Sequence, residues 1–277
     1  MGKLKLGLQL ADKAVRAPSQ SLTPRAVDVS VAQVNSSTRE PKSARPTGKR
    51  LVKEAVQVLC GGWKRLWPRL WIILAAAGVG MLLVLIASDA DNSLLNRLRF
   101  ADGDGTPKRV AAFISDHADL MLAVPLSLLI WGAGVLSGRV RWRKVGLACL
   151  MAALMAGLVV NVFRATTGRP RPRAAQPYTE VKDGLYGPHP FTSKFQSFPS
   201  GHTATSAATA VAIAAAVPVA TIPCAVYAIV VGWSRMQLLM HHPLDVTVST
   251  VIGLVCGLCF ASTVPRVVIR LRRRKKK

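Results

Sequence analysis

The sequence predicts an all-α membrane protein, a six-transmembrane-helix bundle that follows a disordered basic N-terminal tail. Of its 277 residues, 51% are hydrophobic and only 18% are charged, a composition unlike that of an ordinary soluble domain. Six apolar stretches follow the tail, each close to the ~20 residues that a membrane-spanning helix needs. Much of the positive charge, which gives a net charge of +24, lies at the ends of these stretches, where it sets membrane orientation.

Two basic tails flank the predicted membrane domain. Residues 1–55 are rich in Ser, Pro, Thr, Lys and Arg, which is typical of a disordered segment, although an organelle transit peptide has a similar composition. The sequence therefore divides into a cytoplasmic tail at 1–55, a six-span domain at 56–265 and a basic tail at 266–277. We expect the tails to bind anionic lipid headgroups, and we expect no nucleic-acid partner.

The six predicted spans follow one another along the chain. They comprise residues 69–88, 119–137, 145–163, 202–217, 219–235 and 243–264. The fourth and fifth are short, and the alanine-rich sequence of the fourth suits close packing inside a bundle. Gly253 and Gly257 give the last span a similar face of small residues.

The segment 89–118, between the first two spans, carries apolar residues at helical spacing and predicts short interfacial helices. Its motifs "DADN" and "DGDG" lack the distant glutamate of a calcium-binding loop, so we interpret them as turns.

The charges of the loops predict the orientation. The tail at 1–55, the loop 137–144 and the C-terminal tail are strongly basic and fall on one side of a six-span protein, which is therefore the cytoplasmic side. The segment 89–118 holds four basic and five acidic residues and belongs outside. The loops 164–201 and 236–242 then face outside as well.

Three polar clusters lie at the outer ends of the predicted spans. They are "RATTGRPRP" at 164–172, "FPSGHTAT" at 198–205 and "SRMQLLMHHPLD" at 234–245. Ionisable groups at membrane depth are costly and usually mark a functional site. The clusters are predicted to bring to one membrane face the residues Arg164, Arg169, Arg171, Ser200, His202, Arg235, His241 and Asp245.

This set of residues favours phosphate chemistry. Several arginines that converge in a partly dry place need an anion, and their planar forks match phosphate oxygens. Ser200 is the expected N-cap of a helix whose free backbone N–H groups also favour phosphate, and Gly201 lets the backbone approach closely.

Two histidines supply the expected chemistry. His241 and Asp245 are four residues apart, so that a helix beginning at His241 would place the carboxylate near Nδ1 and leave Nε2 as a nucleophile. Pro243 suits the first turn of that helix. His202 would then protonate the leaving oxygen, and the arrangement requires neither a metal nor a cofactor.

At these residues the sequence resembles the type 2 phosphatidate phosphatase family, in its bacterial membrane branch. The family signature is Lys-x6-Arg-Pro, Pro-Ser-Gly-His and Ser-Arg-x5-His-x3-Asp, and this chain departs from it where Arg164 replaces the leading lysine. The resemblance implies a six-helix fold, His241 as the nucleophile that forms a phosphohistidine, Asp245 as its orienting partner and His202 as the general acid. It implies that the phosphate is held by Arg164, Arg171, Ser200, Gly201 and Arg235. His242 does not fit the signature and receives no role, and Arg169 lies inside the first motif without being one of its fixed positions.

The resulting hypothesis is an integral membrane phosphatase that hydrolyses a lipid phosphate monoester or diphosphate. Its expected location is the bacterial inner membrane, with both termini cytoplasmic and the active site on the outer face. Two alternatives stay open. A lipid-to-lipid phosphotransferase would use the same histidine, and a non-enzymatic membrane anchor would act through its basic tails.

Overall fold

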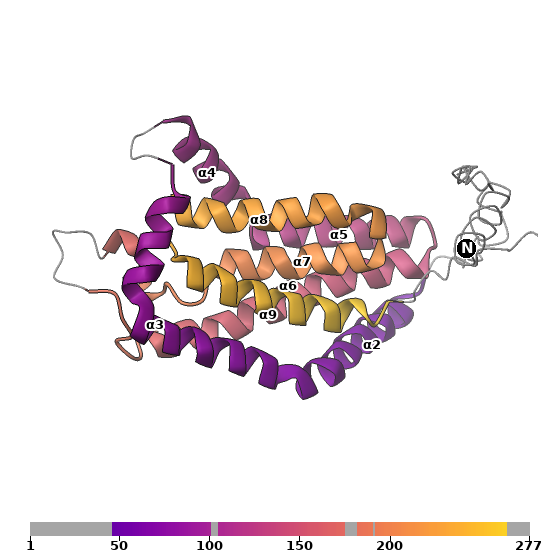
Figure 1. Ribbon diagram of the computed structural model, residues 1–277. Coiled ribbons are helices and arrows are strands. Elements are labelled where there is room, and N and C mark those ends of the chain that lie inside the picture. The colour runs from indigo at the N-terminus through magenta and orange to yellow at the C-terminus, as the bar shows by residue number, and fades with distance from the viewer. Residues whose placement is uncertain (1–45, 101–104, 175–181, 191, 265–277) are drawn as a thin grey trace, which may run out of the picture. The chain divides into compact units, whose positions relative to one another are not determined.

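The computed structural model describes residues 46–100, 105–174, 182–190 and 192–264, and it is helical (Figure 1). The predicted C-terminal tail and most of the predicted N-terminal tail lie outside the described residues. The end of the range 1–55 is helical, however, because the first described helix begins at Gly48. The α-helices are α2 (Gly48–Leu66), α3 (Leu70–Leu98), α4 (Thr106–His117), α5 (Leu120–Leu136), α6 (Val140–Thr167), α7 (Gly201–Ala216), α8 (Thr221–Gln237) and α9 (Pro243–Ala261).

Each predicted apolar stretch coincides with a helix, in the order α3, α5, α6, α7, α8 and α9. Four segments are long and apolar enough to cross a membrane: Gly48–Leu98, Val140–Thr167, Pro218–Gln237 and Pro243–Ala261. The pair α4 and α5, bent by 50°, forms a fifth candidate if it is one span. Helix α7 has only 16 residues, so it is about 24 Å long, shorter than a ~30 Å hydrocarbon core. The described helices therefore provide four or five candidate spans, and the predicted count of six is not confirmed.

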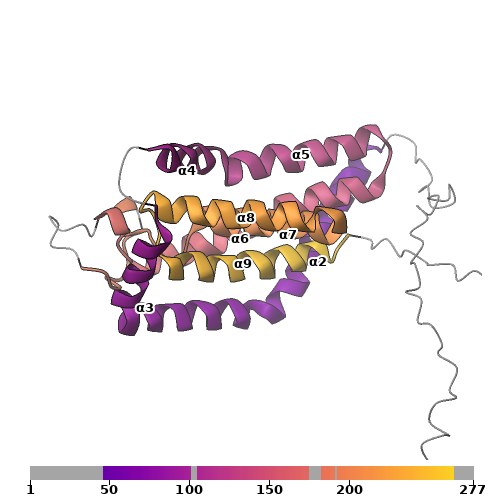
Figure 2. The ribbon, with the colours of Figure 1, turned by 45° about the horizontal axis from the view of Figure 1, so that its top comes forward.

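Helix α7 forms the centre of the bundle and packs against α6, α8 and α9 (Figures 1 and 2). Most of its residues are buried, which agrees with the close packing expected from its alanine-rich sequence. A Cβ atom added at Gly253 would lie 2.6 Å from the carbonyl oxygen of Ala204, and one added at Gly257 would lie 2.8 Å from that of Ala208. These glycines therefore allow the backbones of α7 and α9 to approach closely.

The peripheral helices present apolar side chains outwards. Strongly exposed examples on α3, α5 and α8 are Trp71, Leu85, Ile86, Met121, Leu129, Leu136, Ile222 and Ile229. A large exposed apolar surface is unfavourable in water but matches lipid tails. The surface thus agrees with the candidate membrane spans.

A kink in α3 positions part of the site. Ala87 has non-helical backbone angles, φ −136° and ψ 24°, and the residues after it turn across one end of the bundle (Figure 1). The "DADN" motif at 89–92 lies inside this helix, so its interpretation as a turn was wrong. The helical end of α3 and helix α4 agree with the short helices expected within 89–118. Most of the "DGDG" motif lies outside the described residues.

Helix α2 is fixed to α6 at the other end of the bundle. Both Nε and Nη2 of Arg143 donate hydrogen bonds of 2.8 Å to the carboxylate of Glu54. Both side chains are buried, and a bidentate pair of this kind satisfies two charges at once. The pair places the basic first turns of α2 beside the start of α6.

Candidate active site

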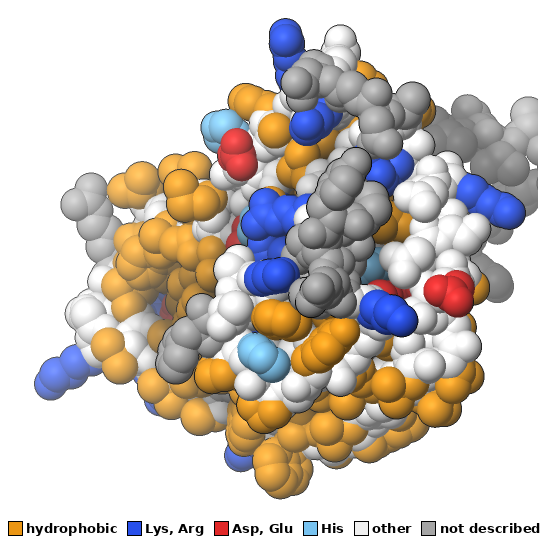
Figure 3. Space-filling view, turned by 90° about the vertical axis from the view of Figure 1, so that its left-hand side faces the viewer, with side chains coloured by type: hydrophobic (Ala, Val, Ile, Leu, Met, Phe, Trp, Pro, Cys, Tyr) orange, Lys and Arg blue, Asp and Glu red, His pale blue; other side chains and the backbone are white. Residues whose placement is uncertain are grey.

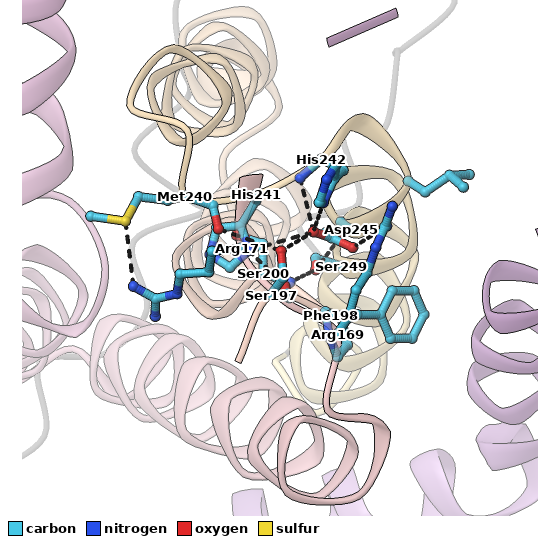
Figure 4. A network of polar contacts seen from close by, with 12 residues as sticks. Arg169, Arg171, Ser197, Phe198, Ser200, Met240, His241, His242, Asp245 and Ser249 are labelled. Carbon is cyan, nitrogen blue, oxygen red and sulfur yellow. Dashed lines mark hydrogen bonds and ion pairs between the residues drawn. The ribbon is translucent and has the colours of Figure 1, made fainter. Parts of the chain in front are cut away.

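The three polar clusters of the sequence meet at the end of the bundle where α6 and α8 end and α7 and α9 begin (Figures 1 and 4). Gly168, in the left-handed conformation with φ 60°, ends α6 and turns the chain into the first cluster. Arg164 Nε donates a hydrogen bond of 2.9 Å to the carbonyl oxygen of Pro199. Thr167 Oγ1 donates to the carbonyl oxygen of Phe198, and Arg169 and Arg171 connect the first cluster to the third.

His241 is completely buried and lies two residues before α9, not within it. Its Nδ1 donates to the carbonyl oxygen of Ser197 at 2.6 Å. Because a carbonyl can only accept, Nδ1 carries the proton and Nε2 keeps its lone pair. Nε2 is buried and has no hydrogen-bond partner among the described residues, so it is available for a bond to substrate.

The partner predicted for His241 was different. Asp245 Oδ2 lies 3.8 Å from His241 Nδ1, beyond hydrogen-bond distance. The reason is that α9 begins at Pro243, so His241 is outside the helical register in which the two residues would share a face. Asp245 Oδ2 instead accepts hydrogen bonds from Ser197 Oγ at 2.6 Å and from the backbone N–H of His242 at 2.8 Å.

The charge of His241 is strongly disfavoured by its surroundings. Burial lowers the pKa of His241 to about 3, and the positive charges of Arg164 and Arg235 lower it as well. The nearby carboxylate of Asp245 has the opposite, smaller effect on this pKa. The imidazole is therefore neutral at physiological pH, as a nitrogen nucleophile must be.

Arg169 is the central cation of a buried network. Its Nη1 donates to Asp245 Oδ1 at 2.7 Å, and its Nη2 donates to Asp91 Oδ2 at 2.8 Å. Asp183 accepts from Nε at 2.9 Å and from Nη2 at 2.6 Å. Burial alone would disfavour the charge of Arg169, but the carboxylates, with Asp245 foremost, raise its pKa above the ordinary value. The network ties α3 and the 164–201 loop to the start of α9.

His242, which received no role from the sequence, is also completely buried. Its Nδ1 lies 3.4 Å from Asp245 Oδ2, and its Nε2 lies 3.6 Å from Asp183 Oδ2. Figure 4 shows it beside Asp245, within the same group of polar contacts as Arg169. His242 thus belongs to the network that surrounds Asp245.

His202, in the first turn of α7, is partly exposed. Its Nδ1 lies 3.2 Å from Oδ2 of Asp119, a residue that precedes α5. This contact directs Nδ1 towards a carboxylate and leaves Nε2 as the nitrogen that can exchange a proton with a ligand.

Arg164 lies against the N-terminus of α7. A Cβ atom added at Gly201 would be 3.0 Å from both Nη1 and Nη2 of Arg164, so the absence of a side chain makes room for this guanidinium group. Because Nε is bonded to the carbonyl oxygen of Pro199, the planar guanidinium group of Arg164 has a fixed orientation. Its two Nη atoms therefore point in defined directions.

Two further arginines reach the same end of the bundle. Arg171 Nη1 contacts Met240 Sδ at 3.3 Å, and burial followed by the charge of Arg173 lowers the pKa of Arg171. Arg235 donates to the hydroxyl of Ser115 in α4. The Nε atoms of Arg171 and Arg235 are buried without a hydrogen-bond partner among the described residues. Figure 3 shows basic side chains gathered near the middle of this end of the protein.

Ser200 is the N-cap residue of α7, as expected, but its side chain makes no capping hydrogen bond. Its hydroxyl instead accepts from Thr203 Oγ1 at 3.0 Å, and its backbone N–H donates to Ser249 Oγ at 2.5 Å. The serine is completely buried and couples the start of α7 to α9.

Several residues of the site were not predicted from the sequence. Asp91 was interpreted as part of a turn, and Asp119, Asp183 and Ser197 were not singled out. Arg169 was noted only as a residue inside a motif. The signal for Asp91 was present, because an aspartate among apolar helical residues usually has a buried partner.

Comparison with known proteins identifies relatives of part of the chain. Residues 145–269 match the PAP2 superfamily. Two curated relatives, both named lipid A 1-phosphatase, come from Rhizobium johnstonii and Rhizobium etli and are 33% and 32% identical over 114 residues. These matches cover 39% of this chain and 43% and 46% of the relatives, so the chain spans less than half the length of the curated relatives that it matches.

A solved structure shares the fold. The PAP2 type phosphatidylglycerolphosphate phosphatase from Bacillus subtilis, described as transmembrane, aligns with a TM-score of 0.53 and 20% sequence identity. The alignment covers 72% of this chain and 94% of that chain. The helical arrangement described above is thus found in a known membrane protein.

Proposed function

We propose, from the premise that residues 145–269 match the PAP2 superfamily, that the protein is an integral membrane phosphatase that removes phosphate from a lipid. The observation that carries the proposal is the state of His241. Its Nδ1 is bonded to a carbonyl oxygen, while its Nε2 is buried, unprotonated and without a partner among the described residues. Such a nitrogen is prepared to attack phosphorus.

The reaction proceeds in two steps. His241 Nε2 forms a bond to phosphorus, the bond from phosphorus to the lipid oxygen breaks, and His202 gives its proton to that oxygen. A water molecule then attacks the phosphohistidine and gives a proton to His202, and inorganic phosphate leaves. Charge on the phosphoryl oxygens is neutralised by the guanidinium groups of Arg164, Arg171 and Arg235.

Binding of the phosphate also uses the start of α7. The residues proposed to hold it are Arg164, Arg171, Ser200, Gly201 and Arg235, with the backbone N–H groups of the first turn. Because three guanidinium groups supply positive charge, the proposed chemistry requires no metal ion. The Arg164 fork replaces the lysine of the family signature and gives the site two Nη groups in a fixed plane in place of one rotatable ammonium group.

The proposed substrate is an amphiphile whose phosphate reaches the end of the bundle while its chains remain in lipid. The exposed apolar surfaces of α3, α5 and α8 support this placement. We further propose six crossings with α7 as the enclosed one, both termini in the cytoplasm, and the active site on the outer face of a bacterial inner membrane. The basic loop 137–144 supports that orientation.

The opposite end of the bundle supports the proposed binding of anionic headgroups. A groove there is lined by Arg50, Lys53, Glu54, Gln57, Val140 and Lys144. Since Glu54 is already paired with Arg143, the remaining charge of this groove is positive. Arg50 and Lys53 belong to the part of the predicted N-terminal tail that the structure describes.

The test is phosphate release from a panel of lipid phosphates in detergent, with EDTA present throughout. We expect release by the wild-type protein, loss of release by His241→Ala, and near wild-type release by His117→Ala, a matched change at an exposed histidine of α4. Brief incubation with a substrate labelled in its phosphate should label the wild-type protein with an acid-labile phosphoryl group. Equal rates for wild type and His241→Ala would overturn the proposal.

A further inference from the structure

Asp119 occupies a backbone conformation that aspartate rarely adopts. It lies at the break between α4 and α5, with φ 83° and ψ −153°, in a region of conformational space that is essentially restricted to glycine. Asp119 is the N-cap residue of α5, a position where aspartate normally bonds the helix's own N–H groups. Its side chain makes no such bond.

The carboxylate of Asp119 contacts α7 instead. Oδ2 lies 3.2 Å from His202 Nδ1, and Oδ1 accepts a hydrogen bond of 2.5 Å from Thr205 Oγ1. His202 and Thr205 lie on the same side of α7, three residues apart, so one carboxylate engages both. A strained backbone and an unused capping position thus coincide with two contacts to the proposed general acid.

We propose that Asp119 is the positioning residue of His202, which it holds with Nδ1–H towards the carboxylate and Nε2 towards the leaving oxygen of the substrate. This inference rests on the proposed function and deepens it, because it assigns a residue outside the three polar clusters to the proton-transfer step.

The charges around His202 show why a carboxylate is needed. Burial is the largest effect that opposes a positive charge on this imidazole, and Arg235 from α8, Arg164 from α6 and Arg171 from the loop after α6 act in the same direction. Asp119, from the break before α5, favours it. Asp119 thus partly offsets the surroundings that disfavour the protonated form of the proposed general acid.

Asp119 acts in both steps. While the bond between His241 Nε2 and phosphorus forms and the bond to the lipid oxygen breaks, the proton on His202 Nε2 moves to that oxygen. His202 is then neutral, with its Nδ1–H still directed to Asp119. In the second step His202 Nε2 takes a proton from the attacking water, and the imidazolium that forms faces the same carboxylate.

The test compares two substrates that differ in the leaving group. One is a long-chain alkyl phosphate, whose alkoxide must be protonated as it leaves. The other is the phosphate of an alkyl-substituted 4-nitrophenol, whose phenolate leaves without a proton. The variants are Asp119→Asn, which keeps the shape, Asp119→Gly, which relieves the strained φ, and Asp119→Glu, which keeps the charge. Asp116→Asn, at an exposed aspartate of α4, is the matched control.

We expect Asp119→Asn and Asp119→Gly to lower kcat/KM for the alkyl phosphate by about 100-fold and for the nitrophenyl phosphate by less than about threefold. Asp119→Glu should recover part of the loss. The alkaline limit of activity on the alkyl phosphate should move to lower pH in both neutral variants, because loss of the carboxylate lowers the pKa of the acid.

Three results would overturn the inference. Equal losses on the two substrates would show a structural role alone, and unchanged rates on both would show none. A wild-type protein that is inactive on both substrates would instead overturn the proposed function itself, and the role of Asp119 with it. Melting temperatures of Asp119→Gly and Asp119→Asn separate loss of folding from loss of proton transfer.

Discussion

Ser197 lies between Asp245 and His241 and contacts both: its hydroxyl donates to Asp245 Oδ2 at 2.6 Å, and its carbonyl oxygen accepts from His241 Nδ1 at 2.6 Å. The aspartate therefore acts on the histidine through the serine and not by direct contact. Asp245 fixes the Ser197 side chain, and the Ser197 backbone fixes the tautomer of His241. Nε2 of His241 is the free nitrogen, as the sequence predicted, but Ser197 and not Asp245 accepts the hydrogen bond from Nδ1.

Replacement of Ser197 by alanine tests this arrangement. The carbonyl oxygen remains, but the hydroxyl anchor to a buried carboxylate is lost, at a cost of about 1.5–3 kcal/mol in the free energy of unfolding. We expect phosphate release to fall about tenfold because His241 becomes less well oriented. Ser206→Ala is the control, since the Ser206 hydroxyl bonds only carbonyls of its own helix among the described residues. Equal effects of the two substitutions on rate and melting temperature would contradict the arrangement.

The Arg169 network predicts a stability effect that a lysine does not rescue. Arg169→Met leaves the carboxylates of Asp91, Asp183 and Asp245 together without their cation, which should lower the free energy of unfolding by about 3–5 kcal/mol. Arg169→Lys should recover little, because one ammonium cannot make the four directed hydrogen bonds of the guanidinium group. Thermal unfolding in detergent measures both variants. Wild-type melting temperature in Arg169→Lys would show that only the charge matters.

The buried His241 predicts how stability depends on pH. Its pKa is about 3 in the folded protein and near 6.5 when unperturbed, so folding favours the neutral imidazole. The stabilisation of the folded protein by the neutral imidazole is complete above about pH 6.5. As the pH decreases towards 3, the free energy of unfolding falls with a slope that approaches about 1.4 kcal/mol per pH unit. Melting temperatures between pH 7 and pH 4 should therefore fall more steeply for wild type than for His241→Asn. Parallel curves would show that His241 does not resist protonation.

Gly201 predicts a defect confined to the binding of phosphate. A Cβ atom at this position meets both Nη atoms of Arg164 at 3.0 Å, and the guanidinium group must shift because Nε is held by Pro199. We expect Gly201→Ala to lower kcat/KM about tenfold, mainly through a higher KM, with little change in melting temperature. Gly132→Ala, where a Cβ atom meets nothing within 4 Å, is the matched control. An unchanged KM in Gly201→Ala would exclude Arg164 from the site.

The sequence was sufficient for the helices because their signal is local. Runs of apolar residues set the positions of α3, α5, α6, α8 and α9, and alternate crossings bring every second connection to the same end. The short α7 shows the limit of this approach. Its alanine-rich composition indicated a buried helix, but its length of 16 residues does not determine whether it crosses the membrane.

The sequence by itself therefore determined the order of the helices and the gathering of the polar clusters at one end. The tertiary structure decided which groups touch. Arg169 reaches Asp91 because α3 bends at Ala87, and His202 reaches Asp119 because the chain breaks between α4 and α5. The physical reason is range: helix formation depends on neighbours a few residues apart, whereas a hydrogen bond between residues 78 positions apart depends on tenths of an ångström set by the packing of the whole bundle.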